Sequence, residues 1–165
     1  FRLSEALRPV RENYDFIVID CPPSLSLLTI NGLVAADAVI IPMQCEYYAL
    51  EGLSALVSTI GRITANLNPE LKIEGILRTM YDPRNSLTLD VSQQLIDHFG
   101  DKVYRTLIPR NVRLAEAPSY GLPVLYYDKQ SRGAKAYLAL ASELARRYEQ
   151  QPRSTPIPTS PQAGE

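Results

Sequence analysis

The sequence predicts an α/β fold, doubly wound around a mostly parallel sheet. Short apolar runs rich in β-branched residues alternate with longer stretches whose apolar residues recur every three or four positions. Several of the short runs stop at a proline, which lacks the N–H needed to continue a sheet ladder. The composition, 45% hydrophobic and 21% charged over 165 residues, is ordinary for one globular domain. Strands that alternate with helices in this way imply βαβ units.

The first expected strand is residues 16–20 (FIVID), four apolar residues that stop at an aspartate followed shortly by two prolines. A short helical stretch over residues 27–36 comes next. Residues 38–42 (AVIIP) form a second buried strand that ends on proline. Residues 50–67 then carry the spacing of an amphipathic helix, which an Asn-Pro pair closes.

The second half continues the alternation. Residues 72–80 (KIEGILRTM) predict a third strand, and the apolar positions after it mark a helix that stops at Gly100, a residue suited to the position just past a helix. Residues 103–108 form an expected fourth strand, again ended by a proline. Residues 124–127 form a short fifth, and residues 131–148 a long final helix rich in Ala and Leu.

The domain is expected to cover residues 1–148. Residues 149–165 place four prolines among polar residues, so they are unable to bury a core and predict a disordered tail. The tail lacks the basic amphipathic pattern that docks helices on membranes, and no apolar run of about 18 residues occurs in the sequence. We therefore expect no membrane contact.

The net charge and the cysteines restrict which partners and which cellular compartment we expect. The formal net charge is −1, so any nucleic-acid binding must come from a local basic patch. Cys21 and Cys45 do not form a CxxC pair. We expect both to be reduced, buried thiols of a cytoplasmic protein.

Four stretches in order along the chain are specific in combination: DCPPSLSLLTINGL from Asp20, IIPMQCEYYALEGL from Ile40, LRTMYDPRNSL from Leu77, and IPRNVRLAEAPSYGLPVLYYDKQSRGAKAY from Ile108. Together they resemble the carboxyl-terminal part of the ParA/Soj chromosome and plasmid partitioning ATPases, of the deviant Walker P-loop class. The resemblance covers roughly residues 14–147. It implies the P-loop NTPase version of the predicted fold.

The phosphate-cradling motif of that class, G-x-x-x-x-G-K-[ST], does not occur in the sequence. In the family this loop belongs to the first strand and helix. The resemblance therefore implies a carboxyl-terminal fragment in which the amino-terminal βα units are missing. We expect ATP hydrolysis of the intact protein and no hydrolysis by this chain alone.

Asp20 ends the first expected strand, at the edge where open α/β sheets bind their ligands. From the residues alone, it either holds Mg²⁺ beside phosphates or caps the helix that follows. The resemblance matches Asp20 to the Walker B aspartate, which would position Mg²⁺ through water, or the attacking water. It also makes Pro22, Pro23 and Ser24 a switch that senses the γ-phosphate. Ser26 stands where the resemblance predicts glycine.

Two further strand ends carry the expected nucleotide-binding residues. Thr79 and Met80 end the third strand, and Pro109, Arg110 and Asn111 follow the fourth. The resemblance implies that they hold the adenine ring of ATP. The backbone at Pro109 and the side-chain amide of Asn111 would pair with the base edge, since Asn offers both a donor and an acceptor. The alternative is two ordinary strand-to-helix turns.

Arginines supply the expected DNA surface. Guanidinium groups bind phosphate through paired hydrogen bonds, and the resemblance aligns Arg84 and Arg113 with arginines that bind double-stranded DNA without regard to sequence. Lys129, Arg132 and Lys135 form a second basic group that could extend this surface. The alternative for each side chain is a solvated surface charge. Binding of this kind is driven by the DNA backbone and depends steeply on salt.

The resemblance implies ATP-dependent partitioning of chromosome or plasmid DNA. ATP with Mg²⁺ would join two subunits into a homodimer that binds nucleoid DNA in the bacterial cytoplasm, and a centromere-binding partner of the ParB/Spo0J type would stimulate hydrolysis. Two alternatives stay open. One is a MinD-like cell-division-site ATPase, which would need a membrane-binding carboxyl end. The other is a non-catalytic DNA- or partner-binding module that lost its P-loop.

Overall fold

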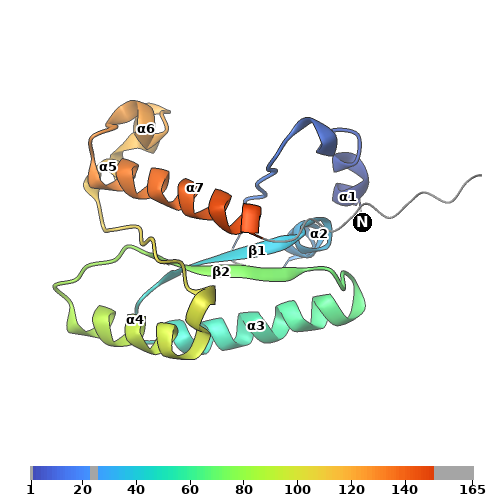
Figure 1. Ribbon diagram of the computed structural model, residues 1–165, viewed down its shortest axis with the longest axis horizontal. Helices are drawn as coiled ribbons and strands as arrows, with labels where there is room; N and C mark the ends of the chain where they lie inside the picture. The colour runs from blue at the N-terminus through green and yellow to red at the C-terminus, as the bar shows by residue number, and fades with distance from the viewer. Residues whose placement is uncertain (1, 23–25, 151–165) are drawn as a thin grey trace, which may run out of the picture.

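The computed structural model describes residues 2–22 and 26–150. Its sheet has two parallel strands, β1 (Ala38–Gln44) and β2 (Lys72–Thr79), paired with one register irregularity after Val39. Both strands run in the same direction, so their carboxyl ends lie at one edge of the sheet, toward the left in Figure 1. The two strands match the second and third strands predicted from the sequence.

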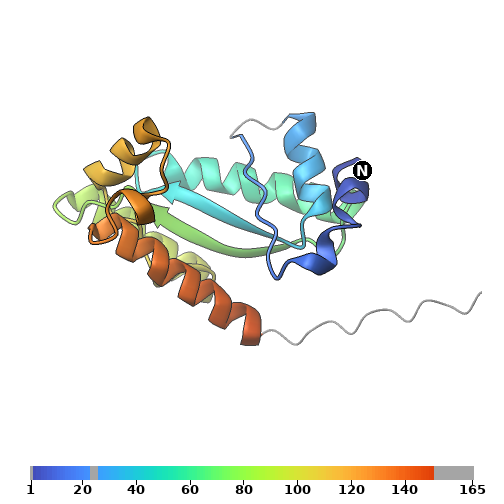
Figure 2. The same cartoon turned by 90° about the horizontal axis from the view of Figure 1, so that it is seen from above.

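Long helices cover both faces of this sheet. α3 (Ala49–Asn66) and α4 (Ser86–Phe99) lie on one face, and α7 (Arg132–Gln150) lies on the other (Figures 1 and 2). All three helices were predicted, α3 and α4 from their apolar spacing and α7 from its richness in Ala and Leu. The arrangement confirms the doubly wound α/β fold with a parallel sheet.

Two apolar layers fill the space between sheet and helices. The layer under α3 and α4 is the larger, and its buried members include Ile41, Leu53, Ile60, Ile76 and Leu95. The layer under α7 contains Leu77, Tyr104 and Ile108, with Leu140 and Leu144 packed against them. Ile76 and Leu77 are neighbours in β2 but belong to opposite layers, as the two-residue period of a strand requires.

Shorter elements complete the chain. They are the helices α1 (Arg2–Leu7), α2 (Leu27–Ala35), α5 (Val112–Glu116) and α6 (Val124–Tyr127), and the 3-10 turns Arg11–Asn13, Gly100–Lys102 and Ala117–Tyr120. α1 packs against α2. α5 and α6 lie together beyond the carboxyl ends of the strands (Figure 1).

Local chemistry explains where the predicted helices begin and end. The Ser26 hydroxyl accepts a hydrogen bond from the N–H of Thr29 at 3.4 Å and so caps α2. Asn85 caps α4 in the same way, through the N–H of Leu87 at 3.0 Å. α4 stops at Gly100, whose φ of 51° favours glycine, as predicted. Ser26 thus has a capping role at a position where we expected glycine.

Residues 16–20 do not form a strand, so this prediction was wrong. Phe16, Ile17 and Val18 are 46%, 38% and 87% exposed. In the described ranges the sheet consists of β1 and β2 alone, and residues 16–20 do not pair with either strand. Cys21, which follows this segment, is exposed instead of buried, whereas Cys45 is buried as predicted. Both thiols are free.

Residues 103–108 also fail to form the predicted regular strand. Val103 forms an isolated bridge with Ile76, and Pro109, just after the segment, forms one with Tyr81. The N–H groups of Tyr104 and Ile108 also donate to the β2 carbonyls of Ile76 at 3.0 Å and Arg78 at 2.9 Å. Between these two points, side chains from β2 and α7 bind the backbone groups that a neighbouring strand would otherwise bind.

Residues 124–127, predicted as a strand, form the helix α6. The carbonyl of Pro123 accepts hydrogen bonds from the N–H groups of Tyr126 at 2.9 Å and Tyr127 at 3.0 Å, which starts a helical turn. A run of four apolar residues does not distinguish strand from helix by its period. No strand lies beside residues 124–127 in the described part of the chain. Their backbone groups therefore form hydrogen bonds within the helical turn.

The last helix ends two residues later than the predicted helix, which covered residues 131–148. α7 continues to Gln150, so residues 149 and 150 are helical, and the rest of the predicted tail lies outside the described residues. Within the described ranges, no helix combines the length and apolarity needed to cross a bilayer.

Candidate functional site

Two chain segments meet at the carboxyl edge of the sheet. The N–H of Tyr81, just past β2, donates to the carbonyl of Ile108 at 3.0 Å, and the N–H of Arg110 donates back to the carbonyl of Tyr81 at 3.0 Å. These bonds form the bridge between Tyr81 and Pro109. They bring together five predicted residues, which we call the base site: Thr79, Met80, Pro109, Arg110 and Asn111.

Met80 turns the backbone at the base site. Its φ of 50° lies in the left-handed region, and no other non-glycine residue in the described ranges has a positive φ. This conformation is costly for a residue with a side chain and persists only where the surroundings hold it. Met80 is partly exposed, so its side chain reaches the surface of the site. Nothing in the sequence indicates this turn, because a methionine does not reveal the φ angle of its backbone.

Asn111 supplies a hydrogen-bond acceptor without a partner. It precedes α5 with extended backbone, yet its side chain does not cap that helix. Its Oδ1 atom is buried, and no described residue donates to it. A buried acceptor left unpaired costs roughly 1–3 kcal/mol. The oxygen retains an unused capacity to accept a hydrogen bond, and neighbouring groups cover it in this structure.

Arg84 extends from the loop between β2 and α4 and pairs with Asp82. Its Nε donates to Asp82 Oδ1 at 2.9 Å and its Nη2 to Asp82 Oδ2 at 2.7 Å. The hydrogen bonds from Arg84 hold the pKa of the Asp82 carboxyl well below its usual range, and the charge of Arg110 lowers it further. The Arg84 side chain is 86% exposed. Exposed ion pairs contribute little stability, so Arg84 can exchange Asp82 for another anion.

Arg113 on α5 also has acidic partners. Its Nη1 donates to Glu116 Oε2 at 2.8 Å, and its Nε lies 3.5 Å from Asp128 Oδ2. Tyr127 donates to the same Glu116 oxygen at 3.1 Å and stacks on Tyr120. The bond from Arg113 lowers the pKa of Glu116, while desolvation and Glu116 raise the pKa of Tyr127. Half of the Arg113 side chain remains exposed.

The second predicted basic group lies at the start of α7. Asp128 Oδ1 accepts the N–H of Ser131 at 3.1 Å, and the Ser131 hydroxyl caps the helix. This turn places Lys129, Arg132 and Lys135 directly after α6, at the same end of the molecule as α5 (Figure 1). Within residues 2–22 and 26–150, no ion pair involves these three side chains.

The structure does not bring Asp20 into contact with the base site. Asp20 and Pro22 are exposed, and the Asp20 carboxylate has no hydrogen-bond or ion-pair partner among the described residues. Its neighbour Cys21 packs on α2, where a Cβ atom added to Gly32 would lie 2.8 Å from the sulfur. The other predicted switch residues, Pro23 and Ser24, lie outside the described residues.

Protein groups alone do not build a cation site in the described ranges. No cluster of three or more His, Cys, Asp or Glu residues there could hold a metal ion. Mg²⁺ commonly keeps several waters and binds through one or two carboxylates together with phosphates of its substrate. A single exposed carboxylate such as Asp20 fits that mode of binding.

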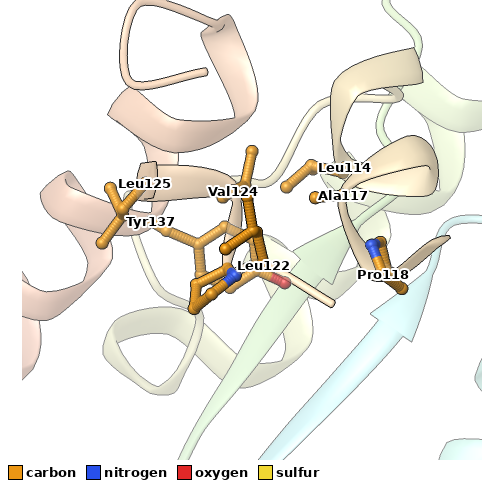
Figure 3. Close-up of a pocket in the computed structure, with 8 residues that line it drawn as sticks. Leu114, Ala117, Pro118, Leu122, Val124, Leu125 and Tyr137 are labelled. Atoms are coloured by element: carbon orange, nitrogen blue, oxygen red, sulfur yellow. The ribbon is translucent and has the colours of Figure 1, made fainter. Parts of the chain in front are cut away.

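An apolar pocket of about 340 Å³ lies among α5, α6 and α7, apart from the base site (Figure 3). Its lining residues are Leu114, Ala117, Pro118, Leu122, Pro123, Val124, Leu125 and Tyr137. None of these side chains carries a charge that could bind phosphate.

Two buried charged residues behind the base site were missed by sequence reasoning. Arg78 of β2 is 7% exposed and Glu143 of α7 is 6% exposed. A signal for both was present in the sequence. Arg78 interrupts the apolar run of the third predicted strand, and Glu143 falls on the apolar face of the last helix, one turn from Leu140 and beside Leu144.

Comparison with known proteins gives consistent relatives. A family model described as an AAA domain matches residues 1–73. The chain is 71% identical over 153 residues to an uncharacterized protein of Pseudomonas putida, and 58% identical over 144 residues to the sporulation initiation inhibitor protein Soj of Bacillus subtilis. These alignments cover 93% and 87% of the chain but 58% and 57% of the relatives. The chain thus spans a little over half the length of the relatives that it matches.

Solved structures agree with the fold. Cobyrinic acid a,c-diamide synthase from Mycobacterium smegmatis, with bound ATP analog and magnesium, matches with a TM-score of 0.72 and 36% identity over 90% of this chain and 53% of that one. Relatives named Soj or ParA are 52–58% identical to the chain. Over 87% to 90% of its length, the chain is thus similar in sequence to chromosome-partitioning proteins named Soj and ParA.

Proposed function

We propose that this protein, in its intact form, is an ATP-dependent DNA-partitioning ATPase of the bacterial cytoplasm. ATP with Mg²⁺ joins two subunits into a homodimer, which binds double-stranded nucleoid DNA without regard to sequence. A centromere-binding partner of the ParB/Spo0J type then stimulates hydrolysis and release. The names of the relatives, chromosome partitioning protein ParA among them, support this assignment.

The observation that carries the nucleotide part is the base site. The backbone at Pro109 and the amide of Asn111 hold the adenine edge, and the unpartnered Oδ1 of Asn111 accepts a hydrogen bond from the exocyclic amine. Thr79 and Met80 flank the base from the neighbouring segment. Ordinary strand-to-helix turns, the alternative, would not account for the buried, unpaired acceptor.

Asp20 is the proposed Walker B aspartate, and Pro22, Pro23 and Ser24 the switch that follows it. The exposed Asp20 carboxylate would hold Mg²⁺ through water. When bound, the cation offsets the negative charge of the ATP phosphates. The residues of this chain then orient the base and the cation at two separate points of the nucleotide.

The DNA-binding part rests on Arg84 and Arg113. Both are exposed, both lie on segments beyond the carboxyl ends of the strands, and both have acidic partners that a phosphate could replace. Lys129, Arg132 and Lys135 extend the surface at the start of α7. Because the net charge is −1, one subunit offers only this local patch, and a dimer that doubles it gains affinity through two linked contacts.

Alanine substitutions in the intact protein test the DNA surface. Arg84→Ala and Arg113→Ala should each weaken binding to a random duplex several-fold and reduce the slope of log affinity against log salt by about 1. ATP affinity should stay unchanged. Arg62→Ala is the matched control, since Arg62 is an exposed arginine on α3 without an ion pair in the described ranges. Loss of ATP binding in either variant, or unchanged DNA binding in both, contradicts the assignment.

Binding assays on the same intact protein distinguish the proposed function from the two alternative functions. ATP-dependent sedimentation with anionic liposomes, without DNA binding, would favour a MinD-like protein. Binding to DNA that is equally strong with and without ATP would favour a non-catalytic module. The proposed function requires DNA binding that depends on ATP.

A further inference from the structure

The backbone of residues 104–106 is held by charged side chains where a strand ladder was expected. Arg78 of β2 binds this segment from the sheet side. Its Nη2 donates to the carbonyls of Tyr104 at 2.9 Å and Arg105 at 3.3 Å, and its Nη1 is anchored on the Ser92 hydroxyl at 2.8 Å. A buried guanidinium thus satisfies two successive carbonyl groups.

Glu143 of α7 binds the same segment from the opposite side. Its Oε1 accepts the N–H of Arg105 at 2.9 Å, and its Oε2 accepts the N–H of Thr106 at 2.8 Å. Arg147, one turn along α7, donates to Glu143 Oε1 at 3.1 Å and lies over the Tyr104 ring at 4.2 Å. Both oxygens of Glu143 are therefore used, and its negative charge is compensated nearby.

This segment leads directly into the base site. The N–H of Ile108 donates to the backbone carbonyl of Arg78 at 2.9 Å, and the next residues are Pro109 to Asn111. Arg78 thus holds the segment with its side chain and the entrance to the base site with its carbonyl. α7 contributes through Glu143, although it lies on the other side of the segment.

We propose that Glu143 is a positioning residue for base recognition. It fixes residues 104–106 and so sets where the Pro109 backbone and the Asn111 amide meet the adenine edge; this role rests on the proposed nucleotide binding. Two parallel N–H groups face one carboxylate, which glutamine does not reproduce because its NH₂ would oppose one of the donors. Small displacements of a binding group are costly for recognition.

The test compares two nucleotides that differ at the base edge. Inosine triphosphate (ITP) carries an oxo group where ATP carries the amino group, and calorimetric titration of the intact protein gives both dissociation constants. We expect the wild type to prefer ATP, and Glu143→Gln to reduce this preference by about fivefold or more. A loss of folded protein lowers both affinities equally and cancels in their ratio. Glu149→Gln, an exposed carboxylate on α7, should leave the ratio unchanged.

The outcomes separate this role from the proposed function. If the wild type prefers ATP and Glu143→Gln keeps that preference, the positioning role is overturned and nucleotide binding stands. If the wild type binds neither nucleotide, or binds both equally, the base site itself is overturned. If Glu143→Gln does not fold, hydrogen exchange of the wild type tests the positioning role instead. ATP should slow exchange of the Arg105 and Thr106 amides more than that of the α3 amides, and equal slowing overturns the role.

Discussion

Glu143 is a buried carboxylate that remains charged. Burial pushes its pKa upward, but hydrogen bonds from Thr106, Arg105 and Arg147 outweigh this and lower the pKa to about 2. The ordinary value is 4.5. Because the pKa is lower in the folded state than in the unfolded chain, the carboxylate stabilises the fold fully above about pH 4.5. That contribution is lost as the pH falls toward 2.

Glu143→Gln should therefore change the pH dependence of stability. We expect the variant to lose about 3 kcal/mol of unfolding free energy at pH 7, where it breaks a buried charged network, and much less at pH 3. Urea unfolding of wild type and variant at both pH values measures the two differences. Glu149→Gln provides the control for loss of one exposed charge. A deficit of the same size at pH 3 and pH 7 would show that the charge of Glu143 does not stabilise the fold.

Tyr104 buries a hydroxyl that has no hydrogen-bond partner among the described residues. Burial, with the negative charge of Glu74, raises its pKa to about 12 from an ordinary value of 10. Tyr104→Phe should raise the free energy of unfolding by about 1 kcal/mol at pH 7, because it removes an unpaired polar group and keeps the ring. Chemical denaturation measures the change, with the partly exposed Tyr137→Phe as control.

The pH dependence of the same variant has a definite sign. The pKa of Tyr104 is higher in the folded protein than in the unfolded chain, so its ionisation favours the unfolded chain. The wild type therefore keeps its full stability below about pH 10 and loses stability as the pH rises toward 12. The stabilising effect of Tyr104→Phe should therefore grow between these values. A variant that is less stable than the wild type at both pH 7 and pH 11 would indicate that the hydroxyl has a bonding partner.

At the scale of elements, β2 and the segment after α4 approach closely at Gly75. A Cβ atom there would lie 2.7 Å from the carbonyl oxygen of Lys102 and 2.7 Å from the Tyr104 ring. Gly75→Ala should destabilise the protein by about 1–3 kcal/mol, since both neighbours are held in place. Gly61 of α3 is the matched control because nothing lies within 4 Å of its Cβ position.

Gly61→Ala should instead stabilise the protein by roughly 0.5–1 kcal/mol, through the lower backbone entropy cost of alanine in a helix. Thermal unfolding of the two variants side by side checks the opposite signs. If both substitutions shift the melting temperature in the same direction, the close packing of β2 against residues 102–104 is not as described.

The elements that the sequence predicted are those determined by local pattern. α3, α4 and α7 have apolar spacing and end signals within their own residues; β2 is buried on both faces, whereas β1 alternates between buried and exposed residues. Residues 103–108 depend on Arg78 and Glu143, which lie far away in sequence. No local pattern carries that information. Residues 16–20 have the pattern of a strand but lack a neighbouring strand in the described chain.

At the scale of the whole molecule, the parallel sheet explains which part of the site could be predicted. The segments that follow β2 and precede α5 meet at Tyr81 and Pro109 because parallel segments end at one edge, a consequence of the predicted fold class. The left-handed Met80 and the unpartnered Asn111 oxygen depend on the detailed backbone path, which sequence does not show. The role of Asp20 remains a prediction, since it has no contact with the base site in the described chain.

This molecule combines two proposed properties, a base site at the sheet edge and a DNA surface of exposed arginines beyond it. ATP-dependent DNA binding by the intact protein tests this connection most directly. Retention of a fluorescent duplex of random sequence is measured with ATP and Mg²⁺, with ADP and Mg²⁺, and without nucleotide, over a range of salt concentrations. We expect the duplex to be retained only with ATP and Mg²⁺, and its retention to fall steeply as the salt concentration rises. Equal retention without nucleotide, or none under any of these conditions, would contradict it.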